Sequence, residues 1–175
     1  MTVNRGRPPT LNAQQILAAA IQCADSDGIG GLTMRAVADC LSVTPMALYR
    51  YVRDKDQLLA QIPDLLMFEV AQAATRQGSG VLALREIAFG LANTLAAHPW
   101  ATRLFEQPEL GPNMQLAAQH CVKRLVAEGA SPDVAFRWIR AVIAQVIGEI
   151  LTSHGAFDRL GLDLLLAEIA KATRP

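Results

Sequence analysis

The sequence predicts an all-α protein built in two parts. Ala, Leu, Gln and Arg dominate the 175 residues, and the alternation of β-branched residues that is typical of strands is rare. Hydrophobic residues make up 51% of the chain and charged residues 18%, so the composition excludes a disordered protein and favours extensive burial. We place the boundary along the fourth expected helix, with an N-terminal part over residues 1–56 and a C-terminal part over residues 57–175.

The sequence also predicts a cytoplasmic protein without a cofactor. No uninterrupted apolar run reaches the ~18 residues that span a bilayer, so we expect no membrane partner. The start, "MTVNRGRPPT", has basic residues but no apolar segment after them. Cys23, Cys40 and Cys121 are odd in number and widely spaced, without a CxxC pair. We therefore expect buried free thiols rather than a disulfide or a zinc site, and neither a metal nor another cofactor.

The N-terminal part contains three short predicted helices. The first runs from about residue 12 to 24 and is stopped by "DSDGIGG". Thr33 can cap a second helix of about two turns. After a short turn, Thr44 is an expected N-cap, and Pro45 takes the first helical position, where its missing N–H would have had no partner. The proline therefore starts the third helix, at about residues 45–51, instead of breaking it.

The C-terminal part is also expected to be helical throughout. Asp54 or a neighbour caps a long fourth helix, "KDQLLAQIPDLLMFEVAQAATR", which Pro63 is expected to kink. Further helices are expected near residues 81–97, 99–106, 113–128, 131–154 and 162–173.

The third helix carries large side chains on a face that does not point inward. A helical wheel puts Leu48 and Val52 on the inner side, and on the other side Pro45, Met46, Tyr49, Arg50 and Arg53. The helix before it has Arg35 and Asp39 pointing away from an inner stripe of Met34, Val37, Ala38 and Leu41. Two short helices with matching inner stripes and a tight turn predict a helix-turn-helix, whose second helix enters the DNA major groove.

The charge distribution favours an anionic partner at the N-terminal end. Residues 1–53 hold five basic and three acidic side chains, a net charge of +2, while the rest of this neutral chain has −2. A segment such as "MALYRYV" on its own is typical of an ordinary surface helix. Here the cap, the proline start, the partner helix and the basic segment "RGRPP" occur together, and this combination favours a DNA-binding helix.

The stretch "GIGGLTMRAVADCLSVTPMALYRYVRDKDQLL" resembles the DNA-binding domain of the tetracycline-repressor (TetR) family of bacterial regulators. The resemblance covers about residues 12–62 and rests on a Gly-rich turn followed by "LT.R..A..L", "V....LY.H" and "K..LL". Ser42 stands where the family usually has glycine, and Tyr51 where it often has histidine. Further on, "HPWATRLFEQPELGPNM" is similar to the regulatory domain of the branch that includes the tetracycline repressor.

The resemblance implies a role in DNA binding for nine residues. Arg35 and Thr44 to Met46 would meet base edges, while Thr33, Tyr49, Tyr51 and Lys55 would lie at phosphates. Arg50 could bond either a base or a phosphate. The complete set is Thr33, Arg35, Thr44, Pro45, Met46, Tyr49, Arg50, Tyr51 and Lys55. Arg5 and Arg7 are either an arm that enters the minor groove or plain disorder.

Two helices in the second part are apolar on nearly every side. They are "DVAFRWIRAVIAQVIGEILTSHG" and "GLDLLLAEIAKAT", and one chain of this length has few helices with which to cover both. Pairing with a second copy in a four-helix interface would cover them, and the resemblance implies the same homodimer. Gly148 would allow close helix approach there. The candidate dimer residues are Val142, Val146, Gly148, Ile150, Leu165 and Ile169.

The remaining helices are expected to enclose a cavity for a small-molecule effector. Its candidate wall residues are Phe68, Phe89, Asn93, Trp100, Phe105, Met114, Gln119, His120 and Trp138. For each of them the more common interpretation is an ordinary core residue, because aromatic and Met side chains at helical spacing usually pack in a core. None of the histidines at positions 98, 120 and 154 aligns with the histidine that holds magnesium–tetracycline in the tetracycline repressor, so the effector is left open.

These observations predict a ligand-responsive transcriptional regulator. It would act as a repressor, bind a palindromic double-stranded operator as a homodimer, and be released by its effector, with Pro63 as a flexible point. The alternative is an all-helical protein-interaction adaptor without DNA binding. An enzyme is not expected, because the sequence has no HExxH, GxSxG or P-loop motif and no Cys/His/Asp group at useful spacing.

Overall fold

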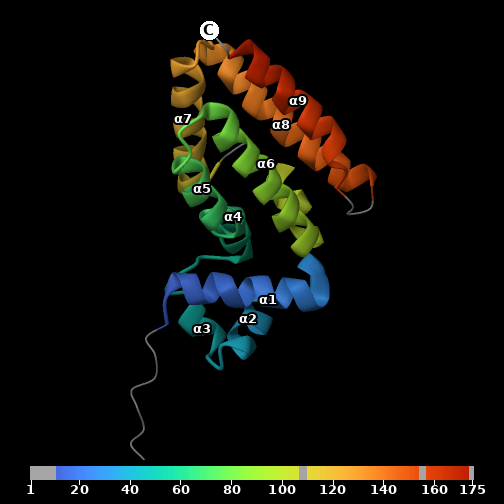
Figure 1. Ribbon diagram of the computed structural model, residues 1–175. Helices are drawn as coiled ribbons and strands as arrows, with labels where there is room; N and C mark the ends of the chain where they lie inside the picture. Colours follow the sequence, from blue (N-terminus) through green and yellow to red (C-terminus); the bar gives the residue numbers. More distant parts are fainter. Residues whose placement is uncertain (1–10, 107–109, 154–156, 174–175) are drawn as a thin grey trace, which may run out of the picture. The chain divides into compact units, whose positions relative to one another are not determined.

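The structure is a computed structural model that describes residues 11–106, 110–153 and 157–173 (Figure 1). These residues form helices, turns and loops without a strand, which confirms the all-α prediction. The chain divides into two compact units, Met1–Ala60 and Gln61–Pro175. Helix α4 (Lys55–Leu66) continues across the division between them.

The first unit contains α1 (Ala13–Gly31), α2 (Met34–Cys40), α3 (Pro45–Leu48) and the start of α4. Asn12 caps α1 in a capping box with Gln15. The expected end of this helix near residue 24 is wrong. Helical backbone continues through the aspartates until Gly28, whose φ of 70° and ψ of 175° interrupt it. A glycine can adopt this positive φ without steric cost, so the kink falls there.

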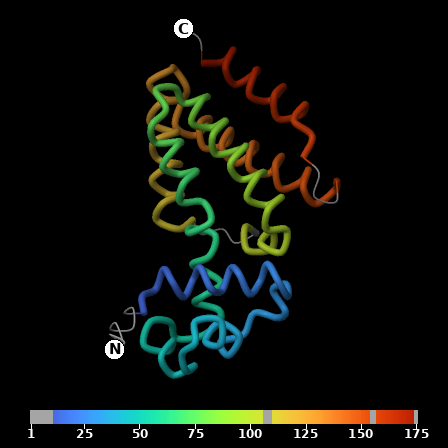
Figure 2. The backbone as a smooth tube through the Cα atoms, turned by 60° about the horizontal axis from the view of Figure 1, so that its bottom comes forward, coloured from blue at the N-terminus to red at the C-terminus, as the bar shows by residue number. Residues whose placement is uncertain are grey.

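The caps of α2 and α3 and the turn between these helices use the residues that the sequence predicts. The Thr33 hydroxyl accepts the Ala36 N–H at 3.1 Å, which confirms the predicted cap. Ser42 has a φ of 55°, the left-handed conformation that its position in the turn requires. Thr44 occupies the N-cap of α3 without a side-chain capping bond, and Pro45 begins the helix. Figure 2 shows α2 and α3 lying along one side of α1.

Helix α3 is shorter than expected, because its regular part ends at Leu48 and turns follow. The first unit nevertheless has a continuous apolar core. Its fully buried side chains include Ile16, Ala20, Leu32, Val37, Ala38, Leu48 and Leu58.

The second unit contains the end of α4, α5 (Phe68–Thr75), α6 (Gly80–Ala97), the 3₁₀ helix η1 (Pro99–Glu106), α7 (Pro112–Ala127), α8 (Pro132–Thr152) and α9 (Arg159–Ala172). The long fourth helix of the prediction is two helices. They separate at Met67, which has a φ of −93° and a ψ of 3°, while Pro63 lies inside α4. The Met67 N–H still bonds the Pro63 carbonyl at 3.0 Å.

Helix α6 is the central element of the second unit and packs against α5, α7, α8, α9 and η1 (Figure 1). By length and apolar composition alone it could cross a membrane. Its apolar side chains instead form the core of this unit, as is usual for the central helix of a bundle. The buried positions are Gly80, Ala83, Leu84, Ile87, Ala88, Leu91, Ala92 and Leu95.

The three cysteines are free thiols, as expected, but they are not all buried. Cys121 is buried, Cys23 is half-buried and Cys40, the last residue of α2, is exposed. The expectation of three buried thiols is therefore wrong for Cys40. Its position at the end of a short surface helix leaves it without a covering element.

Candidate DNA-binding surface and ligand cavity

The helix-turn-helix presents large side chains to solvent above an apolar core. Met46 is 74% exposed and Tyr49 48% exposed, and Arg50 beside them is exposed too. Leu48 on the same short helix is fully buried, together with Val37 from α2. A large thioether and a phenol that stay exposed to water add no buried surface that would stabilise the fold. A face that carries them therefore indicates a binding surface.

The other candidates on this surface include charged and hydroxyl side chains. Arg35 is exposed and lies 4.0 Å from Asp39, an exposed pair that contributes little to stability and leaves the guanidinium available. Thr33, Thr44 and Pro45 are exposed, and Tyr51 is 41% exposed.

Lys55 differs from the other candidates because it is less exposed and bonds the backbone of another helix, α1. It is half-buried, and its Nζ donates to the Ile29 carbonyl at 3.1 Å. The ammonium group has two further protons, which remain available for another acceptor. Arg5 and Arg7, the expected arm, lie outside the described residues.

The second unit contains a cavity of about 60 Å³. Its walls come from α4, α6, η1, α7, α8 and the residues just before α7 and after α4. The lining residues are Pro63, Asp64, Met67, Ile87, Leu91, Leu104, Phe105, Leu110, Gly111, Met114 and Ile143. The lining is apolar except for Asp64, and the volume is far below the ~300–1,000 Å³ of drug-sized sites.

Only two of the nine expected wall residues, Phe105 and Met114, line this cavity. Phe68 is 44% exposed, and Asn93 and Gln119 are exposed as well. The prediction is corrected for these residues, because a helical wheel shows which side chains share a face but not which neighbouring helix meets that face.

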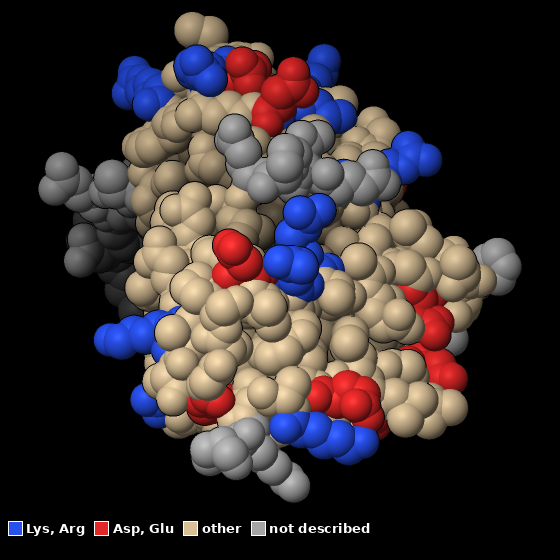
Figure 3. All heavy atoms as spheres, turned by 90° about the horizontal axis from the view of Figure 1, so that it is seen from above, with Lys and Arg blue, Asp and Glu red and all other residues tan. Residues whose placement is uncertain are grey.

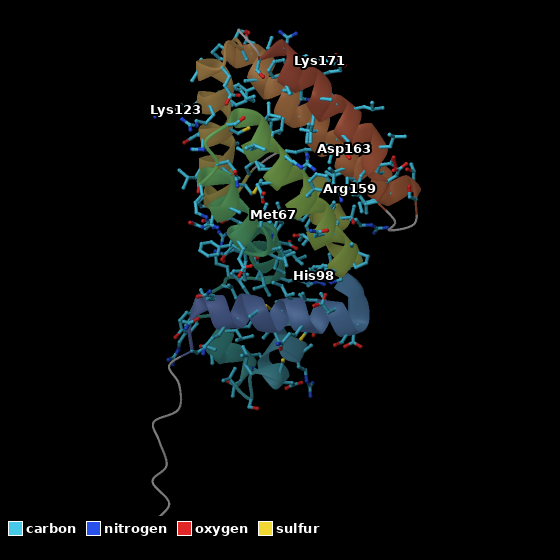
Figure 4. All side chains as sticks on the ribbon, in the orientation of Figure 1. Met67, His98, Lys123, Arg159, Asp163 and Lys171 are labelled. Atoms are coloured by element: carbon cyan, nitrogen blue, oxygen red, sulfur yellow. The ribbon has the colours of Figure 1, made fainter. Side chains whose placement is uncertain are left out.

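The other expected wall residues have different surroundings. His120 Nε2 lies 3.0 Å from the Gln77 carbonyl oxygen. The Phe89 and Phe157 rings pack in a T-shaped arrangement with their centroids 6.1 Å apart. The guanidinium carbons of Arg85 and Arg159 lie 5.1 Å and 4.4 Å from the centre of the Phe89 ring, and Figure 4 labels Arg159. Trp100 and Trp138 are partly buried against the core of the second unit and do not line the cavity.

Asp64 connects α4 to the start of α7 at the edge of the cavity. One carboxylate oxygen accepts the backbone N–H groups of Asn113 at 3.0 Å and Met114 at 3.3 Å, and the other accepts the Asn113 amide at 2.7 Å. A carboxylate at a helix N-terminus satisfies its free N–H groups and is stabilised by the helix dipole. Gly111 permits this close approach, because a Cβ there would lie 2.4 Å from the Asp64 side chain.

The family model for bacterial regulatory proteins of the tetR family matches residues 16–62, which include α2, α3 and their outward side chains. These residues therefore form a DNA-binding domain of the TetR family. The relatives of this chain are transcriptional regulators and not enzymes.

Two curated relatives of this chain are regulators by description. The HTH-type transcriptional repressor DrrR1 of Streptomyces coeruleorubidus is 35% identical over 63% of this chain and 42% of its own length. The tetracycline repressor protein class G of Vibrio anguillarum is 26% identical over 83% of this chain and 70% of its own length. The chain spans about 42% of the length of DrrR1 and 61% of that of a Saccharopolyspora erythraea regulator.

Solved structures share this fold over nearly the whole chain. A TetR variant from Acinetobacter baumannii AYE in complex with minocycline has a TM-score of 0.78 at 24% identity, covering 94% of this chain and 99% of its own. BioQ with its double-stranded DNA operator has a TM-score of 0.70 at 25% identity, covering 92% of this chain and 99% of its own.

The expected dimer residues of this chain need correction. Val142, Val146, Ile150 and Ile169 are at most 5% exposed in the single chain, so they have no surface left to offer a partner. Helices of the same chain cover them, because α6 packs on both α8 and α9. Gly148 and Leu165 remain partly exposed.

Other positions of α8 and α9 carry the exposed apolar surface. Leu151, Leu160 and Leu164 are 55%, 64% and 61% exposed. Small exposed residues at helical spacing accompany them, namely Ala141 and Ala144 on α8 and Ala167 on α9. Figure 4 shows Arg159, Asp163 and Lys171 along α9, so charged groups accompany this apolar surface. In the face drawn in Figure 3, charges of both signs are interspersed among uncharged residues.

Proposed function

We propose that this chain is a ligand-responsive transcriptional repressor that binds a palindromic DNA operator as a homodimer and leaves it when a small molecule binds. The observation that carries the proposal is the outward presentation of Arg35, Met46, Tyr49 and Arg50 above the buried side chains of Val37 and Leu48. An apolar core under a face of cations, phenols and a thioether suits a duplex, which offers phosphates and base edges.

The side chains of this surface fall into two groups, those that would position the protein on the DNA and those that would read the base sequence. Pro45 and Met46 provide apolar contacts suited to a thymine methyl group, and Arg35 can reach a guanine edge. The phenols of Tyr49 and Tyr51 suit phosphate oxygens, which fix register without reading sequence. The repressor description of DrrR1 and the operator complex of BioQ support this use of the surface.

The homodimer would use the exposed apolar face of α8 and α9. Leu151, Leu160 and Leu164 would be covered by a second copy, and the small side chains near Gly148 would let two α8 helices approach closely. A Cβ built at Gly148 meets nothing within 4 Å in the single chain, so space for a partner exists there. Two recognition helices one DNA turn apart, ~34 Å, would then read a palindrome.

The effector would enter the cavity beside Asp64. Its lining favours an uncharged and largely apolar molecule, because the single carboxylate is already occupied by the start of α7. The cavity has to enlarge for such a molecule, and this enlargement would displace α4, which carries both Pro63 and Asp64. Because α4 continues into the first unit, DNA and effector would each weaken the binding of the other by the same factor. The protein would act in the cytoplasm, where the operator is.

Selection of binding sites from random duplex DNA with the purified protein tests this function. We expect a palindromic consensus, and we expect the affinity for it to fall steeply as salt rises, because several phosphate contacts release counterions. A library without enrichment would contradict the proposal. It would favour the protein-interaction adaptor, whose apolar docking face would bind a protein with little dependence on salt.

A further inference from the structure

Two thiols of the first unit lie together on neighbouring helices. Cys23 is half-buried on α1, and Cys40 is exposed at the end of α2. The Cys40 Sγ lies 3.7 Å from Oε1 of Gln22, the residue next to Cys23, so the Cys40 thiol reaches over to α1. Helices α1 and α2 pack together, and the pKa of the Cys23 thiol is raised first by burial and then by the neighbouring Cys40 thiol.

The third thiol is different and provides an internal comparison. Cys121 is fully buried in the second unit and donates to the Gly80 carbonyl at 3.4 Å. Burial raises the pKa of the Cys121 thiol to about 12. Since the thiolate is the reactive form, Cys121 is expected to be inert while the fold is intact.

We propose that Cys23 and Cys40 are an oxidisable pair that hydroperoxides convert to a disulfide, and that this disulfide weakens DNA binding. The disulfide follows from the placement of the two thiols, whereas its effect on DNA rests on the proposed function. In reducing compartments, disulfides that do form are usually transient and redox-sensing.

The reaction takes two steps. The exposed Cys40 thiolate attacks one oxygen of the hydroperoxide, the O–O bond breaks, and the products are a sulfenic acid on Cys40 and water or an alcohol. The Cys23 sulfur then attacks the sulfenic sulfur, an S–S bond forms, and the hydroxyl leaves as water with the proton of Cys23. The two thiols lose two electrons and the hydroperoxide gains them. Burial and then the neighbouring Cys40 raise the pKa of Cys23, so Cys23 ionises less readily than an ordinary thiol, and the first step is assigned to the exposed Cys40.

The Cys23–Cys40 disulfide would change the DNA-binding surface by moving the end of α2. A disulfide holds its sulfurs at about 2.05 Å, closer than two hydrogen-bonded thiols, so its formation draws Cys40 toward α1. Leu41 and Ser42 follow directly, and the left-handed Ser42 sets the direction in which α3 leaves the turn. A shift of Cys40 therefore changes the angle at which Met46 and Tyr49 are presented.

Peptide mapping of the full-length protein tests the disulfide. The reduced protein is treated with hydrogen peroxide, alkylated, digested and analysed by mass spectrometry. We expect a peptide crosslinked through Cys23 and Cys40, with Cys121 alkylated only after unfolding. Cys23→Ser and Cys40→Ser should each abolish the crosslink, and Cys121→Ser should leave it intact. Overoxidation of Cys40 without a crosslink, or a crosslink between two chains in its place, would overturn the proposal.

The effect on DNA is measured on the duplex obtained by site selection. We expect peroxide to weaken binding by about tenfold or more, dithiothreitol to restore it, and Cys40→Ser to bind regardless of peroxide. Unchanged affinity of the crosslinked protein would overturn the regulatory half of the proposal. A reduced protein that binds no duplex would contradict the proposed function and this half together, while the crosslink would stand as a separate result.

Discussion

Asn113 is held by both carboxylate oxygens of Asp64, through its backbone N–H at 3.0 Å and its side-chain amide at 2.7 Å. The two residues are 49 positions apart, and the bonds join α4 to the first turn of α7. Met114 N–H and Gly111, which leaves room for the carboxylate, complete the contact. The contact thus positions one wall of the cavity relative to another.

Asp64→Ala should destabilise the second unit by ~2–3 kcal/mol, because it leaves partly buried N–H groups without an acceptor. Asp64→Asn should cost less, since its carbonyl can still accept one bond. Both tryptophans of the chain, Trp100 and Trp138, lie in this unit, so their fluorescence during urea unfolding reports its free energy of unfolding.

Two further variants test the Asp64 contact, one that perturbs it in another way and one that serves as a control. Gly111→Ala keeps the carboxylate but crowds it, and it should cost ~1–3 kcal/mol through overpacking. Glu86→Ala, at an exposed position of α6, should change the free energy by less than ~0.5 kcal/mol. A loss for Asp64→Ala as small as that of Glu86→Ala would mean that the contact does not hold the two helices together.

Leu48 and Met46 lie two residues apart on α3, and their truncation should have different effects on stability. Leu48→Ala empties a fully buried position and should destabilise the first unit by ~2–5 kcal/mol, with loss of DNA binding. Met46→Ala removes a 74% exposed side chain, so it should change stability by less than ~0.5 kcal/mol yet weaken DNA binding. Thermal unfolding followed by circular dichroism, beside DNA titration, separates the two effects.

Met46→Ala tests the surface only when its stability and its DNA affinity are both measured. A destabilised Met46→Ala protein would mean that the thioether packs inside the unit and is not free for a duplex. Equal DNA affinity of Met46→Ala and the wild type would remove Met46 from the proposed contact surface.

Arg50→Ala should reduce the slope of log affinity against log salt by about one unit if the guanidinium meets a phosphate. The measurement is a DNA titration at several salt concentrations, with Arg85→Ala as the control because Arg85 is an exposed arginine of the second unit. An unchanged slope with relaxed preference at one base pair would assign Arg50 to a base edge instead. Unchanged affinity and slope would exclude it from the surface.

Leu164→Glu should convert the proposed homodimer to a folded monomer, because it places a charge in the proposed apolar interface of α8 and α9. Sedimentation analysis gives the mass, and circular dichroism gives the helical content. Leu82→Glu, at a 50% exposed leucine of α6, is the matched control and should remain dimeric. If both variants dissociated, or if neither did, the interface would lie elsewhere.

Features that depend on a single turn of chain could be predicted from the sequence. The Thr33 cap, the proline that begins α3 and the buried Leu48 each depend on residues a few positions apart, so local rules suffice. The end of α1 was missed because aspartates are tolerated in a helix, and only Gly28 adopts the positive φ that interrupts it.

The cavity and the interface could not be predicted in the same way. An apolar helix needs cover on several sides, but its own residues do not say whether a helix of the same chain or a second copy supplies that cover. Val142 and Val146 are covered within the chain, whereas Leu160 and Leu164 remain exposed.

The sequence by itself determined the all-α class, the TetR-type helix-turn-helix and the outward arginines, because periodicity and capping act over one or two turns. Tertiary structure alone decided which residues line the cavity, that Asp64 meets Asn113, and that the Cys40 thiol meets Gln22 beside Cys23. These contacts join residues far apart in the chain, and only the packing of whole helices brings them within bonding distance.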